Sequence, residues 1–426
     1  MGGIHDREGK RFALLIVLGF DQIRLRCGER ERHEKYLKRV TAVMKKTVAF
    51  YCPDQHIQYD LHTLDEIGVG GGITARIRMA HALALAGHQV SLYINCPREG
   101  LIQGVRYQHY SSVEHFQEEI LIATTSGGKL DLSILNEKRI DSKLKILMVH
   151  GVIYPGGISN DYFDSVYALS NYVRDIAIKR WEISPRKIYV THRGVKADFY
   201  ESHEAKLRNP FWLAYCGHPS KGLGAAIGVL KELRQKDDRY ILHVFGGRQL
   251  WGELEEGFDE QPGVVYHGLV GQKQLAQELS RMGFCLNLQS REEPFGMVVI
   301  EAMRAGCIVI ASKVGAFPEL IRSGNNGFLI EGHKEVQAIL RVAKMILALN
   351  QNHTYSEQIR RHAISSPLPW EVLAQAWSGH WEWLLGSRIL ETDDGDFGYC
   401  SNCGGKWLLL ADGLHCSECG YYQNGA

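Results

Sequence analysis

The chain has 426 residues, of which 45% are hydrophobic and 23% are charged, and its formal net charge is +1. This length predicts two or three domains, and the composition is ordinary for a globular protein with a sizeable core. A net charge near zero excludes a basic nucleic-acid-binding surface over the whole chain. The longest apolar run, residues 12–18, is too short to span a bilayer and has no cleavage site after it, so we expect a cytoplasmic protein.

The first 43 residues differ in charge from the rest of the chain. They hold ten Lys and Arg against six Asp and Glu, a balance of +4 that leaves −3 for the remainder. Two interpretations stay open. Residues 1–43 are either a dispensable, disordered extension before a true start at Met44, or a basic arm for an anionic membrane surface. The second interpretation would place the protein peripherally on the inner face of the membrane.

A β-branched and aromatic run at residues 47–52 predicts the first buried strand. The sequence GVGGG at residues 68–72 follows it, and apolar residues at helical spacing then predict a helix that Gly87 ends. Glycines before a helix let a ligand approach the backbone N–H groups, although such a loop can also be a flexible turn. Further strands of this domain are expected at residues 88–93, 120–123, 145–149 and 185–190.

The strand at residues 145–149 ends in His150, and ligands of α/β sheets bind at the carboxyl ends of strands. A lone histidine in such a place is more often structural than catalytic, so both roles stay open.

In the second half, strands are expected at residues 211–216, 241–245, 264–268 and 284–288. Strands that alternate with helices on both sides of residue 200 predict two parallel, doubly wound sheets with a cleft between them. The loop after the strand at 211–216 contains Gly217, His218 and Lys221. Lys221 suits a phosphate partner, and the alternative is a solvated loop lysine. Arg248 follows the next strand and lies either in the cleft or on the surface.

The most informative stretch is REEPFGMVVIEAMRAG at residues 291–306. Its pattern predicts a helix that begins near residues 295–297, with Glu293 just outside it and Glu301 about one turn inside. The N–H groups at a helix start have no partner within the helix and favour an anion. Two acids around an anion site suit a nucleotide sugar, which has phosphates between two hydroxyl-bearing sugars. The alternative is that both are ordinary acids near a helix start.

This stretch resembles the signature of retaining glycosyltransferases of family 4, which have the GT-B fold. The resemblance rests on the spacing Glu293-x7-Glu301, with Pro294-Phe295-Gly296 after the first acid and Ala302-Met303 after the second. It continues through an expected strand at 307–311, Gly315, PELI at 318–321 and NGFL at 326–329. It covers about residues 45–386.

The resemblance implies roles for individual residues. Glu301 would bind the nucleotide ribose, Glu293 the donor-sugar hydroxyls, and His150 would lie near the reacting sugar. Gly71 and Gly72 would face both the donor phosphates and the acceptor. The residues that would face the donor phosphates from the second domain are Gly217, Lys221, Gly296, Met297 and Val298. The chain also departs from the family, because His218 stands in the place of an arginine and Lys196 in the place of an acid.

A second motif lies near the C-terminus, where Cys400-x2-Cys403-x12-Cys416-x2-Cys419 provides four thiolates for tetrahedral zinc. Such a module is too small to fold by apolar burial alone, and it resembles a zinc ribbon. Four protein ligands leave no open coordination position, so we expect a structural zinc ion. The other six cysteines are scattered, which favours buried thiols over a disulfide framework.

We therefore predict an α/β protein of the GT-B class with two Rossmann-like domains, on the acceptor side at residues 44–200 and on the donor side at 201–366. A crossover helix at 367–386, an acidic linker at 387–398 and a zinc ribbon at 399–426 would follow. The resemblance implies retaining transfer, without a catalytic metal, from a nucleoside diphosphate sugar to the hydroxyl of a sugar or a lipid-linked sugar.

Two other hypotheses stay open. One is a GT-B scaffold or sugar-binding protein without activity, whose ribbon contacts a partner. The other is a factor that binds protein or nucleic acid through the ribbon, although Lys406 is the only basic residue in 399–426, which makes nucleic acid an unsuitable partner.

Overall fold

The structure is a computed structural model that describes the chain from Lys45 onward. Segments outside the described residues are 126–129, 201–207, 252, 254–259, 333–334, 387–399, 401, 403–404, 411–412, 417–420 and 424–426. The predicted extension at residues 1–43, the linker at 387–398 and the thiols of Cys403 and Cys419 therefore lie outside it.

An eight-stranded sheet forms the centre of the N-terminal domain, in the order β10-β9-β8-β6-β1-β2-β4-β3. Only β3 is antiparallel to its neighbour. Most of its strands are apolar on both sides because helices cover both faces. The strands are β1 (Thr47–Tyr51), β2 (Gln89–Ile94), β3 (Gly100–Ile102), β4 (Val105–His109), β6 (Ile120–Thr124), β8 (Leu144–Met148), β9 (Ser165–Ala168) and β10 (Ile188–Val190), with a separate pair of β5 (His115–Phe116) and β7 (Arg139–Ile140).

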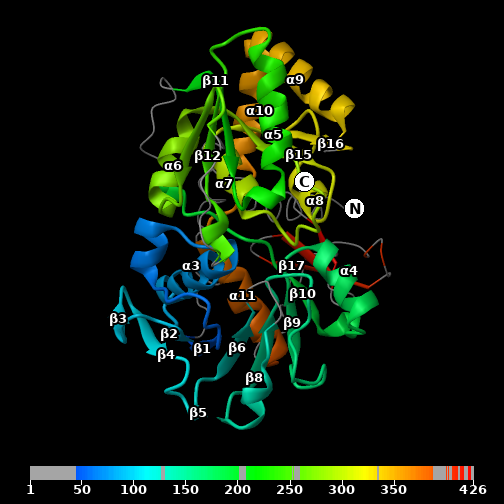
Figure 1. Ribbon diagram of the computed structural model, residues 1–426. Coiled ribbons are helices and arrows are strands. Elements are labelled where there is room, and N and C mark those ends of the chain that lie inside the picture. Colours follow the sequence, from blue (N-terminus) through cyan, green and yellow to red (C-terminus); the bar gives the residue numbers. More distant parts are fainter. Residues whose placement is uncertain are drawn as a thin grey trace, which may run out of the picture.

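The second sheet has six parallel strands in the order β13-β12-β11-β14-β15-β16. Figure 1 shows it as the upper of the two domains, again with helices on both faces. Its elements are β11 (Asn209–Cys216), α5 (Leu223–Arg234), β12 (Ile241–Phe245), β13 (Val264–Gly268), α6 (Gln272–Arg281), β14 (Met282–Asn287), α7 (Met297–Arg304), β15 (Ile308–Ser312), α8 (Phe317–Leu320), β16 (Phe328–Ile330), α9 (Val336–Gln351) and α10 (His353–Ser365). The prediction of two parallel, doubly wound sheets is confirmed.

Three longer helices cover the N-terminal sheet, namely α3 (Gly71–Leu85), α4 (Asn171–Arg180) and α11 (Trp370–Leu384). Helix α11 returns from the second domain and packs beside α3, with Trp377 stacked against Phe50 of β1. Three of its tryptophans, Trp370, Trp377 and Trp381, are buried packing residues. Short turns of helix are η1 (Thr63–Ile67), η2 (Ser133–Asn136), η3 (Pro185–Lys187), η4 (Ala197–Phe199), η6 (Pro219–Lys221) and η7 (Arg248–Trp251).

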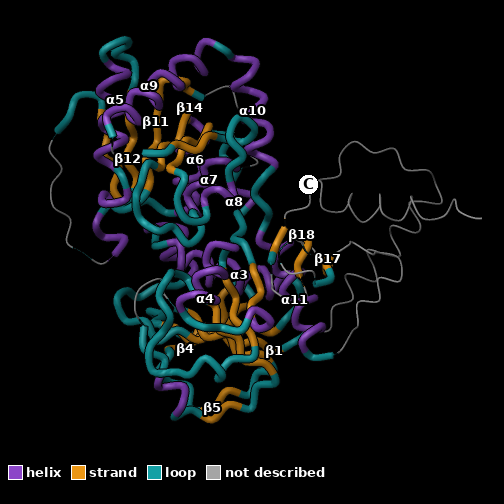
Figure 2. The backbone as a smooth tube through the Cα atoms, turned by 90° about the vertical axis from the view of Figure 1, so that its right-hand side faces the viewer, coloured by secondary structure: helices purple, strands orange, loops and turns teal. Residues whose placement is uncertain are grey.

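The C-terminal segment forms an antiparallel sheet of β17 (Trp407–Leu410), β18 (Gly413–Cys416) and β19 (Tyr422–Gln423). It lies on the N-terminal domain, and Figure 2 shows β17 and β18 beside α11. The ring of His415 stacks on Tyr189 of β10, with ring centres 4.7 Å apart. The side chain of Asn171, at the start of α4, pairs with the backbone of Tyr422 through two hydrogen bonds of 2.9 and 3.1 Å.

In the part of the chain that the structure describes, no helix is long and apolar enough to cross a membrane. Among these described residues there is also no group of three or more His, Cys, Asp or Glu side chains that could hold a metal ion. Because two of the four motif cysteines lie outside them, the predicted zinc site stays a prediction.

Candidate active site

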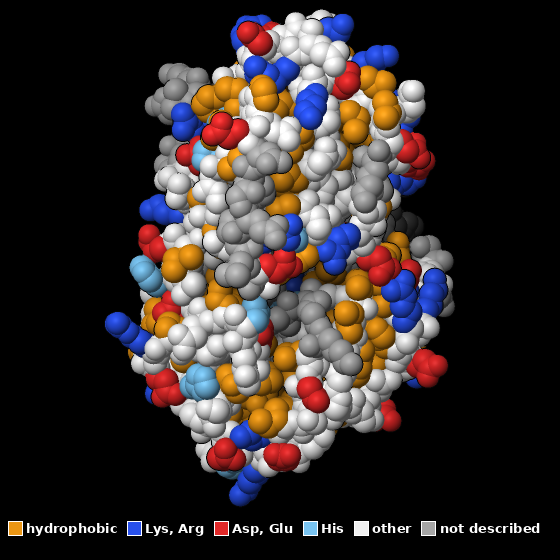
Figure 3. All heavy atoms as spheres, viewed as in Figure 1, with side chains coloured by type: hydrophobic (Ala, Val, Ile, Leu, Met, Phe, Trp, Pro, Cys, Tyr) orange, Lys and Arg blue, Asp and Glu red, His pale blue; other side chains and the backbone are white. Residues whose placement is uncertain are grey.

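A cavity of about 760 Å³ lies between the two domains and is lined by residues from both. On its N-terminal side are the ends of β1 and β8 and the start of α3. On the other side are the loops after β11 and β14 and the start of α7. In Figure 3, Lys, Arg, Asp and Glu side chains are spread over the whole displayed face, including the middle of the view.

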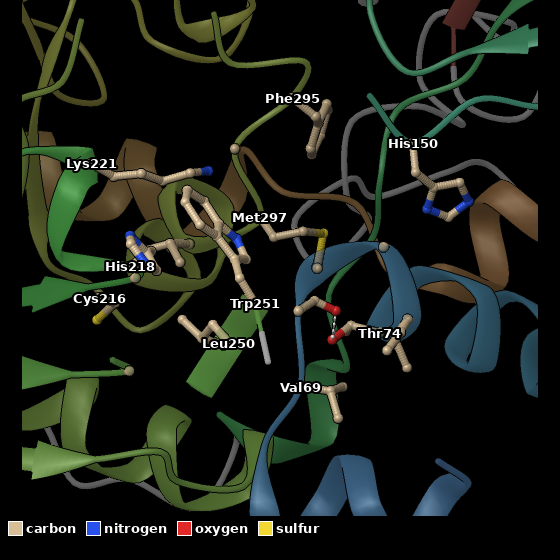
Figure 4. Close-up of a pocket in the computed structure, with 18 of the residues that line it drawn as sticks. Val69, Thr74, His150, Cys216, His218, Lys221, Leu250, Trp251, Phe295 and Met297 are labelled. Carbon is tan, nitrogen blue, oxygen red and sulfur yellow. Dashed lines mark hydrogen bonds between the residues drawn. The ribbon is translucent and has the colours of Figure 1, made fainter. Parts of the chain in front are cut away.

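Nearly all of the predicted site residues line this cavity, although they come from distant parts of the sequence. They are Gly71, Gly72, His150, Gly217, His218, Lys221, Glu293, Gly296, Met297, Val298 and Glu301. Figure 4 shows Lys221 and His218 on one side and His150 on the other, with Met297 between them. Arg248 is not among the lining residues, and its guanidinium lies 3.3 Å from the carboxylate of Glu253.

Two helix starts meet at this cavity. Helix α7 begins at Met297 after Gly296, which has a φ of 104° that favours glycine. A Cβ on Gly296 would lie 2.5 Å from the ring of Phe317, so any other residue here would displace that ring and strain the backbone. A Cβ on Gly71, in the first turn of α3, would lie 2.9 Å from Cγ of Met297. Both helices lack a side-chain cap, so their first N–H groups are open to an anion.

Glu293 and Lys221 form an ion pair at the cavity, with Nζ of Lys221 donating to Oε2 of Glu293 at 2.9 Å. Gln289 donates a second hydrogen bond of 3.0 Å to the same oxygen. Glu293 is buried and Lys221 is about one-third exposed. The ammonium can therefore reach a ligand in the cavity while the carboxylate keeps a fixed position.

The carboxyl group of Glu301 is buried at the cavity and accepts a hydrogen bond of 2.7 Å from Nε2 of Gln272. Gln272, at the start of α6, in turn accepts from Nε of Arg78 in α3 at 2.8 Å. These contacts connect the two domains. Burial raises the pKa of Glu301 to about 7. Sequence reasoning missed Gln272, because a glutamine at a helix start carries no signal of its own.

This raised pKa predicts a pH-dependent stability. An ordinary glutamate has a pKa of 4.5, so between that pH and about 7 the folded chain keeps a proton that the unfolded chain has released. Stability should fall as pH rises across this window, by about 3 kcal/mol, since a tenfold change in proton affinity corresponds to about 1.4 kcal/mol. Glu301→Gln should abolish the fall in denaturant unfolding curves measured from pH 4.5 to 8. The exposed Glu331→Gln is the matched control, and an unchanged slope in Glu301→Gln would refute the assignment.

His150 is buried at the end of β8 and is held as a neutral imidazole. Its Nδ1 accepts a hydrogen bond of 3.0 Å from Nη2 of Arg193, so Nε2 carries the proton. Its backbone N–H donates to Thr125 Oγ1 at 3.0 Å. Burial, together with the charges of Arg193 and Arg76, holds the pKa of His150 well below its usual range. This side chain therefore offers the cavity a hydrogen-bond donor.

His218, which stands in the place of the family's arginine, has several contacts within the protein. Its ring stacks on Trp251, with centres 3.7 Å apart, and Nδ1 accepts from the backbone N–H of Ser220. Its Nε2 lies 3.3 Å from the carboxylate of Glu253. Both ring nitrogens thus have partners within the protein. Lys196 lies 2.6 Å from Asp198 and does not line the cavity.

The loop before α7 is also fixed by the first domain. The hydroxyl of Ser170, which caps α4, donates to the carbonyl of Pro294 at 2.8 Å. Across the same junction, the carboxylate of Glu319 accepts the backbone N–H groups of Asn171 and Tyr172, each at 2.8 Å. The start of α4 therefore positions the loop that carries Glu293.

Comparison with known proteins gives partial matches. Residues 211–348 match the family model "Glycosyl transferases group 1". D-inositol 3-phosphate glycosyltransferase of Streptomyces scabiei is 30% identical over 179 residues, which cover 37% of this chain and 40% of that protein. Spore coat protein SA of Bacillus subtilis is 22% identical over 353 residues, which cover 72% of this chain and 93% of that protein. The chain spans only about two fifths of the first curated relatives, 40% and 41%.

Solved structures show the same fold. HepE of Anabaena, in complex with UDP and glucose, aligns with a TM-score of 0.56 at 16% identity, over 80% of this chain and 100% of that one. A glycosyltransferase from Rickettsia africae aligns with a TM-score of 0.59 at 15% identity, over 81% and 100%. The chain thus has an α/β, GT-B-like fold, and its residues 211–348 match the model of group 1 glycosyl transferases.

Proposed function

We propose that this protein is a retaining glycosyltransferase that moves a sugar from a nucleoside diphosphate sugar to an acceptor hydroxyl. The observation that carries the proposal is the placement of Glu293, Glu301 and Lys221 around the start of α7 in one interdomain cavity. Two carboxylates for hydroxyl groups and a cationic centre for phosphates match the chemistry of such a donor.

In this proposal, Glu301 accepts the ribose hydroxyls, and the N–H groups of Met297 and Val298 bind the diphosphate. Glu293 accepts hydroxyls of the donor sugar, while Gly71 and Gly72 face the phosphates and the acceptor. As the glycosidic bond breaks, negative charge grows on the departing diphosphate. Lys221 and the start of α7 are already oriented toward that charge, and such preorganised electrostatics commonly contributes more to catalysis than any other single effect. The oxygen of the acceptor hydroxyl then bonds to the sugar carbon on the face that the diphosphate leaves, and the proton of the hydroxyl passes to the departing diphosphate.

The relatives support this reaction type without fixing the substrates. The Anabaena structures contain UDP and UDP-glucose, and a relative from Xanthomonas campestris is named for GDP-mannose. We therefore propose a nucleoside diphosphate hexose as donor and a sugar or lipid-linked sugar as acceptor, in the cytoplasm or at the inner membrane face. The rival proposal, a GT-B scaffold without activity, is favoured by the contact of His218 with Glu253.

A donor screen distinguishes the two proposals. UDP-, GDP- and ADP-sugars are added to the purified chain, and the melting temperature and the release of free sugar are measured. One donor should stabilise the wild type, by about 2.7 kcal/mol at roughly 100 times its Kd, and should be hydrolysed slowly. Glu301→Ala should lose this stabilisation, because the ribose then has no acceptor, whereas Glu331→Ala should keep it. No response to any of these donors would favour the scaffold.

We further propose that the C-terminal segment is a ribbon with one structural zinc ion held by Cys400, Cys403, Cys416 and Cys419. The described part of the motif fits this ion. Cys400 and Cys416 are buried in one cluster with Trp407. The backbone N–H of Asn402 donates to Sγ of Cys400 at 3.4 Å, a contact that stabilises a thiolate ligand. Bound zinc would crosslink the two halves of the ribbon and take no part in the transfer.

A further inference from the structure

The N-terminal wall of the cavity contains two hydrogen-bond donors that the protein leaves without partners. Arg193 and His150 both line the cavity, with only 3% and 5% of their surfaces exposed. They bond to each other through Nη2 and Nδ1, but Nη1 of Arg193 and Nε2 of His150 have no hydrogen-bond partner among the described residues. Buried polar groups are rarely left in this way, so two adjacent ones indicate a missing ligand.

This wall is also electropositive. Arg193 forms no ion pair among the described residues, and burial beside Arg76 lowers its pKa to about 9, which still leaves it charged at neutral pH. Arg76 is buried as well and bonds to Thr124 Oγ1 and to the backbone oxygen of Thr125. The described residues that line this wall include one carboxylate, Asp54, and it is hydrogen-bonded to His56.

The start of α3 adds to the same site. A Cβ on Gly72 would lie 3.1 Å from Nδ1 of His150, so the first turn of this helix touches the imidazole. The helix has no acid in its first turn and no side-chain cap, so its N–H groups and dipole add positive potential beside His150. A buried uncompensated arginine is costly, and a bound anion would remove that cost.

We propose that the acceptor carries an anionic group, a phosphate monoester or a carboxylate, which binds to Arg193, His150 and the start of α3. This inference rests on the proposed transferase function, because it assigns the N-terminal wall to the acceptor. Although Gly71 and Gly72 also face the phosphates of the donor, the charged partners of these phosphates, Lys221 and the start of α7, lie on the opposite wall. The anion would hold the acceptor beside the donor sugar.

The test measures binding of inorganic phosphate to the full chain by calorimetry, at constant ionic strength. It is done alone and in the presence of the nucleoside diphosphate (UDP, GDP or ADP) that binds best. Phosphate should bind in both cases. Arg193→Met should weaken phosphate by roughly tenfold to a hundredfold, because charge-assisted hydrogen bonds are lost. Its affinity for the diphosphate should stay within about twofold, since Arg193 does not touch that wall.

Two control variants and one pair of ligands make the result specific. Arg186→Met removes an exposed arginine just before β10, the strand that precedes Arg193. This variant should change neither the affinity for phosphate nor the affinity for the diphosphate. Arg193→Lys keeps the charge and should bind phosphate more tightly than Arg193→Met. If the Met variant does not fold, Arg193→Lys can still be compared with the wild type, and it should bind phosphate more weakly. Glycerol 3-phosphate should bind and glycerol should not.

Three results would overturn the inference: equal phosphate binding in wild type and Arg193→Met, displacement of phosphate by the diphosphate, or no phosphate binding at all. Failure of every diphosphate to bind the wild type would instead refute the transferase function. Phosphate binding is measured without a diphosphate as well, so failure of the anion site can be distinguished from failure of the transferase proposal.

Discussion

Lys221→Met should lower the rate of sugar transfer by roughly 100-fold to 1000-fold, the usual effect of removing one donor from a preorganised oxyanion site. The ammonium now lies 2.9 Å from Glu293 and is a flexible cation on the donor wall of the cavity. In the transition state, its charge would be shared with the departing diphosphate. The loss should therefore appear in kcat more than in KM, because the interaction strengthens as the bond breaks. Initial rates with the donor found in the screen measure it.

Two further variants make this result interpretable. Lys231→Met removes an exposed lysine from α5 and should leave the rate unchanged. Glu293→Gln removes the partner carboxylate, and in a double-mutant cycle its effect should not add to that of Lys221→Met, because the two groups act as one unit. A Lys221→Met protein with an unchanged kcat would exclude the proposed role.

Cys416→Ser should remove zinc from the protein and unfold the ribbon. Metal binding contributes about 10 kcal/mol or more to small zinc domains, which cannot fold by apolar burial alone. Elemental analysis should give about one zinc ion per wild-type chain and almost none in the variant. Hydrogen exchange of residues 407–423 should become fast, and the contact of His415 with Tyr189 would be lost. The two main sheets have separate cores and should remain folded.

The matched control for this variant is Cys96→Ser, which changes another buried cysteine outside the motif and should keep its zinc. Retention of zinc by Cys416→Ser would contradict the four-cysteine site. The ribbon pairs with Asn171, whose backbone N–H is also held by Glu319 from the second domain. We therefore expect a moderate fall in melting temperature from Cys416→Ser, because the domain junction at α4 loses one of its supports.

Much of the architecture follows from local sequence patterns. The apolar run at residues 241–245 coincides with β12, because a strand buried on both faces needs a continuous run of apolar residues. The start of α7 was also predictable. Gly296 supplies the positive φ that precedes the helix, and Glu301 lies about one helical turn after the first residue, Met297.

The cavity partners were not predictable in this way. Gln272 binds Glu301 from 29 residues away, and Arg193 binds His150 from 43 residues away. Neither arginine nor glutamine has a sequence pattern that indicates a partner at such a distance. The departure at His218 was visible in the sequence, but its contacts with Trp251 and Glu253 were not.

The sequence by itself therefore determined the two-domain α/β architecture, and nearly all of the ligand-binding residues that it predicted outside the cysteine motif line the cavity, because strand burial, helix starts and glycine conformation are local properties. Only the tertiary structure decided which charges are paired. It showed Lys221 joined to Glu293 and Arg193 left with an unsatisfied donor at the cavity wall. Pairing depends on how two domains bring distant side chains together, and packing determines that arrangement.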